Sequence, residues 1–149
     1  MKTKDLEVLT AEFFGIRKNL IVPNVYWGFG LRYEADLVVV TRSRYAYEVE
    51  LKVTKSDLKA EAKKAKHAHN SPKFKRLYYS MPEKIFDPEL VPERAGIILA
   101  SDYRGKTRLE LHRKPKDVKA DPITESEYLK LLELCAMRLW GMKKKGIKW

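Results

Sequence analysis

Two neighbouring strand-like segments, at 33–40 and 45–53, constrain the fold more than any other feature of this sequence. In the second segment apolar and charged side chains alternate, which places them on opposite faces of a strand. The apolar face holds Tyr47, Val49, Leu51 and Val53, and the charged face holds Glu48, Glu50 and Lys52. An antiparallel register that places Asp36 opposite Glu50 also places Glu34 opposite Lys52. A slip of one residue would mix carboxylates with the apolar face, so the pattern favours this register.

The predicted register gathers four carboxylates, those of Glu34, Asp36, Glu48 and Glu50, on one face. Clustered carboxylates repel one another, and Lys52 relieves only part of that repulsion. A divalent cation with hard oxygen ligands, such as Mg²⁺, would relieve the rest. Metal-assisted hydrolysis of a phosphodiester follows as a hypothesis. The alternative is a solvated sheet face on which acids and lysines form ordinary ion pairs.

The rest of the chain predicts an α/β fold in the order α-β-β-β-α-β, followed by a hairpin and a last helix. Thr124 to Glu127 forms a capping box that opens this helix. The apolar face predicted for it carries Tyr128, Leu131, Leu132, Cys135, Leu139 and Met142. The predicted elements are a helix over 5–18, strands over 20–27, 33–40 and 45–53, a helix capped by Ser56 that runs to about 69, a strand over 74–81, a loop over 82–95, hairpin strands over 96–100 and 107–111, and the helix from 124.

Length and composition narrow the class of protein. A chain of 149 residues suits one domain, with a core at about 5–81, an extension at about 96–142 and a basic tail at 143–149. No run of about 18 apolar residues occurs, so we expect no membrane segment. The start of the chain is amphipathic rather than apolar, and Cys135 is the single cysteine. We therefore expect a protein of the reducing cytoplasm.

Charge gives the first indication of a partner. Lysine and arginine number 31 against 20 acids, a net charge of +11, which attracts polyanions such as nucleic acid. Lys55, Lys59, Lys63 and Lys66 recur at helical spacing and form one basic stripe. The stripe follows the acidic hairpin directly, so we expect its first lysines to contact phosphates near the acids. The alternative is a solvated lysine-rich face.

Asp36 followed by Glu50-Leu51-Lys52, in this order of elements, resembles the PD-(D/E)XK nuclease superfamily. The segments 34–40, 47–52 and 56–58 look more narrowly like its MmcB-like branch of DNA-repair-associated and phage proteins. The resemblance covers roughly residues 5–81. It implies a restriction-endonuclease-like core with a mixed sheet, and Mg²⁺-dependent cleavage of DNA in which Mn²⁺ substitutes. By the motif, Asp36 and Glu50 hold the metal and Lys52 is the catalytic lysine.

One departure from the motif is that Ala35 precedes Asp36, where the superfamily name has proline. Some members of the superfamily bind nucleic acid without cutting it, so a non-catalytic binding module is the second hypothesis and a basic interaction protein the third. Glu34, Glu48 and Glu12 are candidate additional acids, with Glu7 a weaker one. Candidates for stacking on bases are Trp27, Tyr33, Tyr78 and Tyr79, and the alternative is that these side chains pack in the core or on the sheet.

The expected substrate is DNA, and RNA stays open as an alternative. The resemblance points to DNA repair or phage DNA metabolism in the cytoplasm of a bacterial or phage-infected cell. A homodimer is also an open alternative, since many nucleases that cut both strands use two sites.

Overall fold

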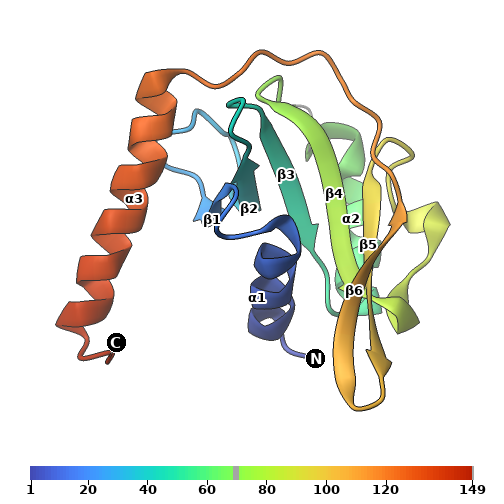
Figure 1. Cartoon of the computed structure of the whole chain (residues 1–149). Helices are drawn as coiled ribbons and strands as arrows, with labels where there is room; N and C mark the ends of the chain where they lie inside the picture. The colour runs from blue at the N-terminus through green and yellow to red at the C-terminus, as the bar shows by residue number, and fades with distance from the viewer. Residues whose placement is uncertain (69–70, 149) are drawn as a thin grey trace.

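The computed structural model describes residues 1–68 and 71–148, with side chains described at 1–64 and 71–148. It is an α/β fold built on one six-stranded mixed sheet (Figure 1). The helices are α1 (Thr3–Phe14), α2 (Lys55–Ala68) and α3 (Glu125–Lys144), and the strands are β1 (Leu20–Val25), β2 (Ala35–Val40), β3 (Ala46–Leu51), β4 (Phe74–Pro82), β5 (Gly96–Tyr103) and β6 (Lys106–Arg113). The predicted order α-β-β-β-α-β, with a hairpin and a helix after it, is confirmed.

The strands lie in chain order, from β1 at one edge to β6 at the other. The pairs β1–β2, β2–β3 and β5–β6 are antiparallel, and β3–β4 and β4–β5 are parallel. Because β1 is an edge strand, it tolerates Pro23, which has no N–H to donate. The sheet is mixed because α2 carries the chain back to the start of β4, alongside β3.

The register predicted for the acidic hairpin agrees with the residue pairs observed between β2 and β3. Leu37 pairs with Val49, and Val39 pairs with Tyr47. One step further along this register, Asp36 lies across from Glu50. Hydrophobic alternation therefore fixed which side chains share a face, as expected where one face of a strand is buried.

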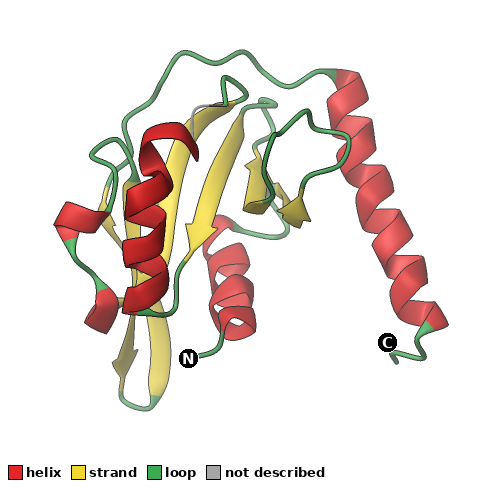
Figure 2. Ribbon diagram, turned by 180° about the vertical axis from the view of Figure 1, so that it is seen from behind, coloured by secondary structure: helices red, strands yellow, loops and turns green. Residues whose placement is uncertain are grey.

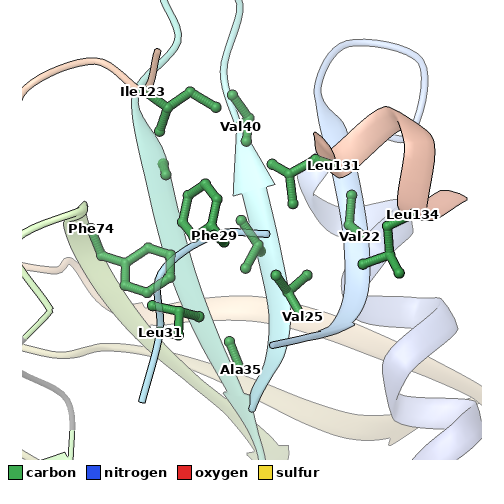
Figure 3. Close-up of a cluster of buried hydrophobic side chains, with 12 residues drawn as sticks. Val22, Val25, Phe29, Leu31, Ala35, Val40, Phe74, Ile123, Leu131 and Leu134 are labelled. Atoms are coloured by element: carbon green, nitrogen blue, oxygen red, sulfur yellow. The ribbon is translucent and has the colours of Figure 1, made fainter. Parts of the chain in front are cut away.

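Helices cover both faces of the sheet. Helix α1 packs Leu6 against Leu37, Val39 and Val49 on one face, and α2 packs Leu58 against Leu77 and Tyr79 on the other (Figures 1 and 2). Helix α3 stands beside the β1 edge. Its Leu131 and Leu134 join a third cluster with Phe29 and Leu31, from the loop between β1 and β2 (Figure 3).

Several helix boundaries differ from the predictions. Helix α1 ends at Phe14 rather than near residue 18, because Gly15 takes a left-handed conformation and caps it. Thr54, not Ser56, caps α2: its hydroxyl accepts the N–H of Asp57 at 3.1 Å. The predicted end of α2 at about 69 lies outside the described residues. Between β4 and β5 the predicted loop contains two short 3₁₀ turns, Glu83–Ile85 and Pro88–Leu90.

Helix α3 opens with the predicted capping box of Thr124 and Glu127. Its apolar face is only partly as predicted: Leu131 and Leu134 are buried, whereas Leu132, Leu139 and Met142 are exposed. Leu139 and Met142 lie in the half of the helix that extends past β1 (Figure 1), and Leu132 is turned about 100° around the helix from the buried Leu131. The helix includes Lys143 and Lys144, which we had expected in the tail. Within 1–68 and 71–148, no helix is both long and apolar enough to cross a membrane.

Candidate functional site

The carboxylate of Asp36 lies at the start of β2, at the sheet end where β3 finishes. One of its oxygens, Oδ2, accepts the backbone N–H of Leu51 at 2.9 Å. Asp36 is half-buried, so part of its carboxylate stays accessible. This hydrogen bond ties the aspartate to the residue immediately before Lys52 and joins the two halves of the motif.

Lys52 lies between two carboxylates. Its Nζ is 3.5 Å from Oε2 of Glu50 and 3.3 Å from Oε2 of Glu61 on α2. The side chains of Lys52, Glu50 and Glu61 are 13%, 6% and 15% exposed. The backbone N–H of Lys52 donates to the carbonyl of Ser80 on β4 at 3.0 Å. Strand pairing therefore holds the lysine, and the two acids hold its ammonium.

The environment of Lys52 keeps it charged. Burial alone lowers the pKa of the ammonium, but attraction to Glu50, Glu61 and Asp36 outweighs burial, and the net pKa is raised. Lys52 is therefore protonated at neutral pH. In this charged form it can donate hydrogen bonds and stabilise negative charge.

Glu48 is on the same face of β3 as Glu50 but deeper, and it is 1% exposed. Its Oε1 accepts the hydroxyl proton of Tyr33 at 3.0 Å. Burial and the negative charges of Glu48 and Glu50 raise the pKa of Tyr33. Glu34, in contrast, is exposed and accepts from the side-chain amide of Asn24 at 3.0 Å. The four predicted acids therefore differ in burial and do not form one solvated face. Glu48 and Glu50 are buried, Asp36 is half-buried and Glu34 is exposed.

The first helix brings Glu7 rather than Glu12 toward the site. The pKa of Glu7 is raised, first by burial and then by the charge of Asp36, so the two carboxylates are close enough to interact electrostatically. Glu12 is exposed, five residues further along α1 and about 7.5 Å away along the helix axis. The weaker of the two helix candidates is therefore the one that the fold places near Asp36.

Glu61 was missed by the sequence reasoning. It lies three residues after Leu58, which is buried against the sheet, so the two side chains share the inner face of α2. The sequence signal that could have identified Glu61 is its position three residues after Leu58, an apolar residue expected to face the sheet.

The basic stripe is only partly available for a ligand. The Nζ of Lys55 is 3.4 Å from Oδ2 of Asp87. The pKa of Asp87 is lowered, first by the N–H of Glu89 and then by Lys55 and Lys59. Lys59 and Lys63 are exposed on α2. The side chain of Lys66 lies outside the described residues.

The donor set suits a hard cation held by few protein ligands. Among the described side chains, no group of three or more His, Cys, Asp or Glu is arranged to hold a metal ion. Asp36 and Glu50 would supply two carboxylates from adjacent strands. Mg²⁺ is commonly bound by one or two carboxylates together with water and substrate phosphate, so this pair fits that mode.

A cavity of about 770 Å³ opens at the same sheet end but on the α1 face. Leu9, Val53, Pro82 and Ala100 are among the residues that line it. Its lining includes none of Asp36, Glu50 and Lys52, so it is separate from the candidate site.

Comparison with protein-family models gave no match, and comparison with curated proteins gave none either. Among solved structures, the chain is similar to the SPO1766 protein of unknown function from Silicibacter pomeroyi, with a TM-score of 0.72 and 18% sequence identity. The match covers 100% of this chain and 97% of that one. At this identity the likeness shows the fold alone, over its whole length.

Proposed function

We propose that this protein is a metal-dependent nuclease that hydrolyses phosphodiester bonds of DNA. The observation that carries the proposal is the placement of Lys52 within 3.5 Å of Glu50, beside an Asp36 whose carboxylate is hydrogen-bonded to the intervening Leu51. These three residues are the ones that the resemblance to PD-(D/E)XK nucleases assigns to catalysis. A net charge of +11 supports a polyanionic substrate.

The roles follow from the geometry. Asp36 and Glu50 would hold Mg²⁺, or Mn²⁺ in its place. Bound there, the metal would lower the pKa of a water molecule and polarise the phosphodiester. The Lys52 ammonium would orient the attacking water and stabilise the charge that develops on the phosphate. In the metal-free site these carboxylates raise the pKa of Lys52, which favours the charged ammonium.

The burial of the charges supports an evolved site. Removing three charged side chains from water carries a desolvation penalty, and apolar side chains at these positions would avoid it. Glu50 is buried to 6% exposure, whereas Asp36 is half-buried and is the more accessible of the two proposed metal ligands. That arrangement suits one phosphate group approaching from solvent.

The test is a cleavage assay on the purified full-length chain. Single-stranded, double-stranded and flapped DNA are incubated with Mg²⁺, with Mn²⁺ and with EDTA. We expect metal-dependent products, and a rate at least about 100-fold lower in Asp36→Asn, Glu50→Gln and Lys52→Met. Glu110→Gln removes an exposed acid on β6 and serves as the matched control, with unchanged activity.

A non-catalytic nucleic-acid-binding protein on the same fold is the second candidate. It is favoured by the pairing of Lys52 with two carboxylates, which already balances much of the charge at the site. Salt-sensitive binding with no cleavage under any metal condition would support this candidate and overturn the nuclease proposal. Failure to bind any nucleic acid at low salt would overturn both.

A further inference from the structure

Two large aromatic side chains are exposed at the sheet end that carries the candidate site. Tyr26 is 58% exposed and Trp27 is 50% exposed. By contrast, Tyr78 and Tyr79 are buried in the sheet. Exposed adjacent aromatics are uncommon on a surface without a partner, because each side chain offers a large apolar area to water.

The strand register places this pair beside Asp36. Pro23 pairs with Leu37 and Val25 with Ala35, so Asn24 lies across from Asp36. Tyr26 and Trp27 are the next two residues after Val25. With about 5 Å between opposite residues of the two strands and at most about 3.3 Å per residue along the chain, their backbone lies within roughly 12 Å of Asp36. That separation is of the order of one or two nucleotides.

The backbone that carries the pair is anchored on both sides. Before it, the guanidinium of Arg138 on α3 donates hydrogen bonds to the carbonyls of Pro23 and Asn24. After it, Gly28 has φ +81°, and a Cβ at that position would lie 3.1 Å from Cβ of Lys130. The loop then buries Phe29 completely in the cluster of Figure 3.

The two contacts on α3 are eight residues apart, or about 12 Å along the helix. Tyr26 and Trp27 therefore lie against a fixed support, although their rings face solvent. Anchoring of this kind reduces the conformational entropy that would be lost when a ligand covers the rings.

Exposed positive charge is present both on the loop that carries the aromatic pair and on the helix that supports it. Arg32, in the same loop, and Lys130, on α3, are both exposed. A flat aromatic surface with cations beside it complements a nucleobase and its phosphate. Continuous duplex DNA offers no free base faces along its length, whereas an unpaired nucleotide does.

We propose that Tyr26 and Trp27 form a stacking platform for an unpaired nucleotide next to Asp36. The protein therefore prefers nucleic acid with a single-stranded segment, such as a free single strand, a flap or a frayed end, over continuous duplex. The cleavage preference rests on the proposed function, and the binding preference does not.

The experiment measures binding without metal. Trp140→Phe and Trp149→Phe are introduced together so that Trp27 is the only tryptophan that emits. Titration with a single-stranded oligodeoxynucleotide in EDTA quenches this fluorescence, while the matching blunt duplex leaves it within about 10% of its starting value, since stacking requires an accessible base face.

Variants then locate the contact by anisotropy of a labelled oligonucleotide. Trp27→Ala and Tyr26→Ala each weaken single-strand binding roughly 5- to 100-fold, the range expected for loss of one base stack. Trp27→Phe keeps an aromatic face and retains most of the affinity. Phe13→Ala, which removes a 40% exposed aromatic side chain from α1, leaves the affinity unchanged.

Three results would overturn the platform. Trp27→Ala could bind as tightly as the parent, or duplex could quench Trp27 as strongly as the single strand. Alternatively, Trp27 fluorescence could change with protein concentration alone, which would show that a second copy of the chain covers the pair. Repeating the titration in Asp36→Asn separates the two proposals, because stacking persists there even if no variant and no parent cleaves DNA.

Discussion

The two faces of β3 differ sharply although they belong to the same six residues. On the α1 face, Val49 and Leu51 pack in an apolar cluster with Leu6. On the opposite face, Glu48 and Glu50 are buried between two apolar clusters, one that includes Leu58 of α2 and one that includes Leu131 of α3. Apolar burial stabilises the fold directly, whereas each buried carboxylate needs a partner to offset its lost hydration. The apolar face therefore stabilises the sheet, and the charged face carries the candidate site.

Neutral polar groups on the α1 face form a self-contained pair. The hydroxyls of Thr10 and Ser80 lie 2.8 Å apart, and that of Thr10 also donates to the carbonyl of Leu6 at 2.6 Å. Both residues are fully buried. Here the hydrogen bonds are satisfied within the fold, while the charged face reaches solvent through Asp36 and Lys52.

Truncation on the apolar face should have the largest effect. Leu37→Ala is expected to lower the free energy of unfolding by about 2–5 kcal/mol, because Leu37 is 1% exposed and its loss leaves a cavity. Urea unfolding measures the change. Leu139→Ala, at a 38% exposed site on α3, should cost under about 1 kcal/mol. If Leu37→Ala lowered the free energy of unfolding by less than 1 kcal/mol, the apolar face would not be the main source of stability that we infer.

Removing the ammonium from the charged face should have the next largest effect. Lys52→Met leaves Glu50 and Glu61 facing each other, and we expect a loss of roughly 1–3 kcal/mol in urea unfolding at pH 7. The double variant Lys52→Met/Glu61→Gln should recover most of it. Lys55→Met, from the more exposed pair with Asp87, should cost under about 1 kcal/mol. Equal losses at the two lysines would show that burial of Lys52 has no energetic consequence.

The neutral pair gives a smaller effect that tests its independence. Thr10→Val removes a buried hydroxyl and leaves the hydroxyl of Ser80 without this partner. We therefore expect the free energy of unfolding to fall by about 1–2 kcal/mol. Because the pair is self-contained, Thr10→Val/Ser80→Ala should be less destabilised than the sum of the single variants. DNA cleavage per folded molecule should stay within twofold. Strict additivity in urea unfolding would contradict the pairing.

Glu7 gives the smallest effect, and its sign depends on pH. Its folded-state pKa is raised above the ordinary 4.5, so the favourable contribution of the protonated form is present below pH 4.5 and is lost as pH rises through the folded value. Glu7→Gln should therefore raise stability at pH 7 by a few tenths of a kcal/mol and change it little at pH 4. If Glu7→Gln were less stable than the parent at pH 7, the inference that burial and Asp36 disfavour the charged form of Glu7 would be wrong.

Sequence alone predicted the features that depend on local periodicity. The alternation at 45–53 fixed the pairing of Leu37 with Val49, and the capping box at Thr124 fixed where α3 begins. Gly15 marked the end of α1, although the apolar spacing up to Ile16 suggested a longer helix. Ile16 is 62% exposed, so that spacing carried no packing information.

The features that were missed depend on which elements meet in space. Glu61 joins Lys52 only because α2 lies over the β3–β4 end of the sheet, and Glu7 approaches Asp36 only because α1 lies over the opposite face. Trp27 was a candidate from its type alone, and its exposure became a usable observation only once Arg138 and Gly28 fixed the loop on α3.

By itself the sequence determined which residues of each strand share a face, because that depends only on the two-residue period of the backbone and on the need to bury one side. Only the tertiary structure decided how deeply each charge is buried and what neutralises it. Those properties arise from contacts between segments far apart in the chain, and the free energy of a charge depends on everything within a few ångströms of it.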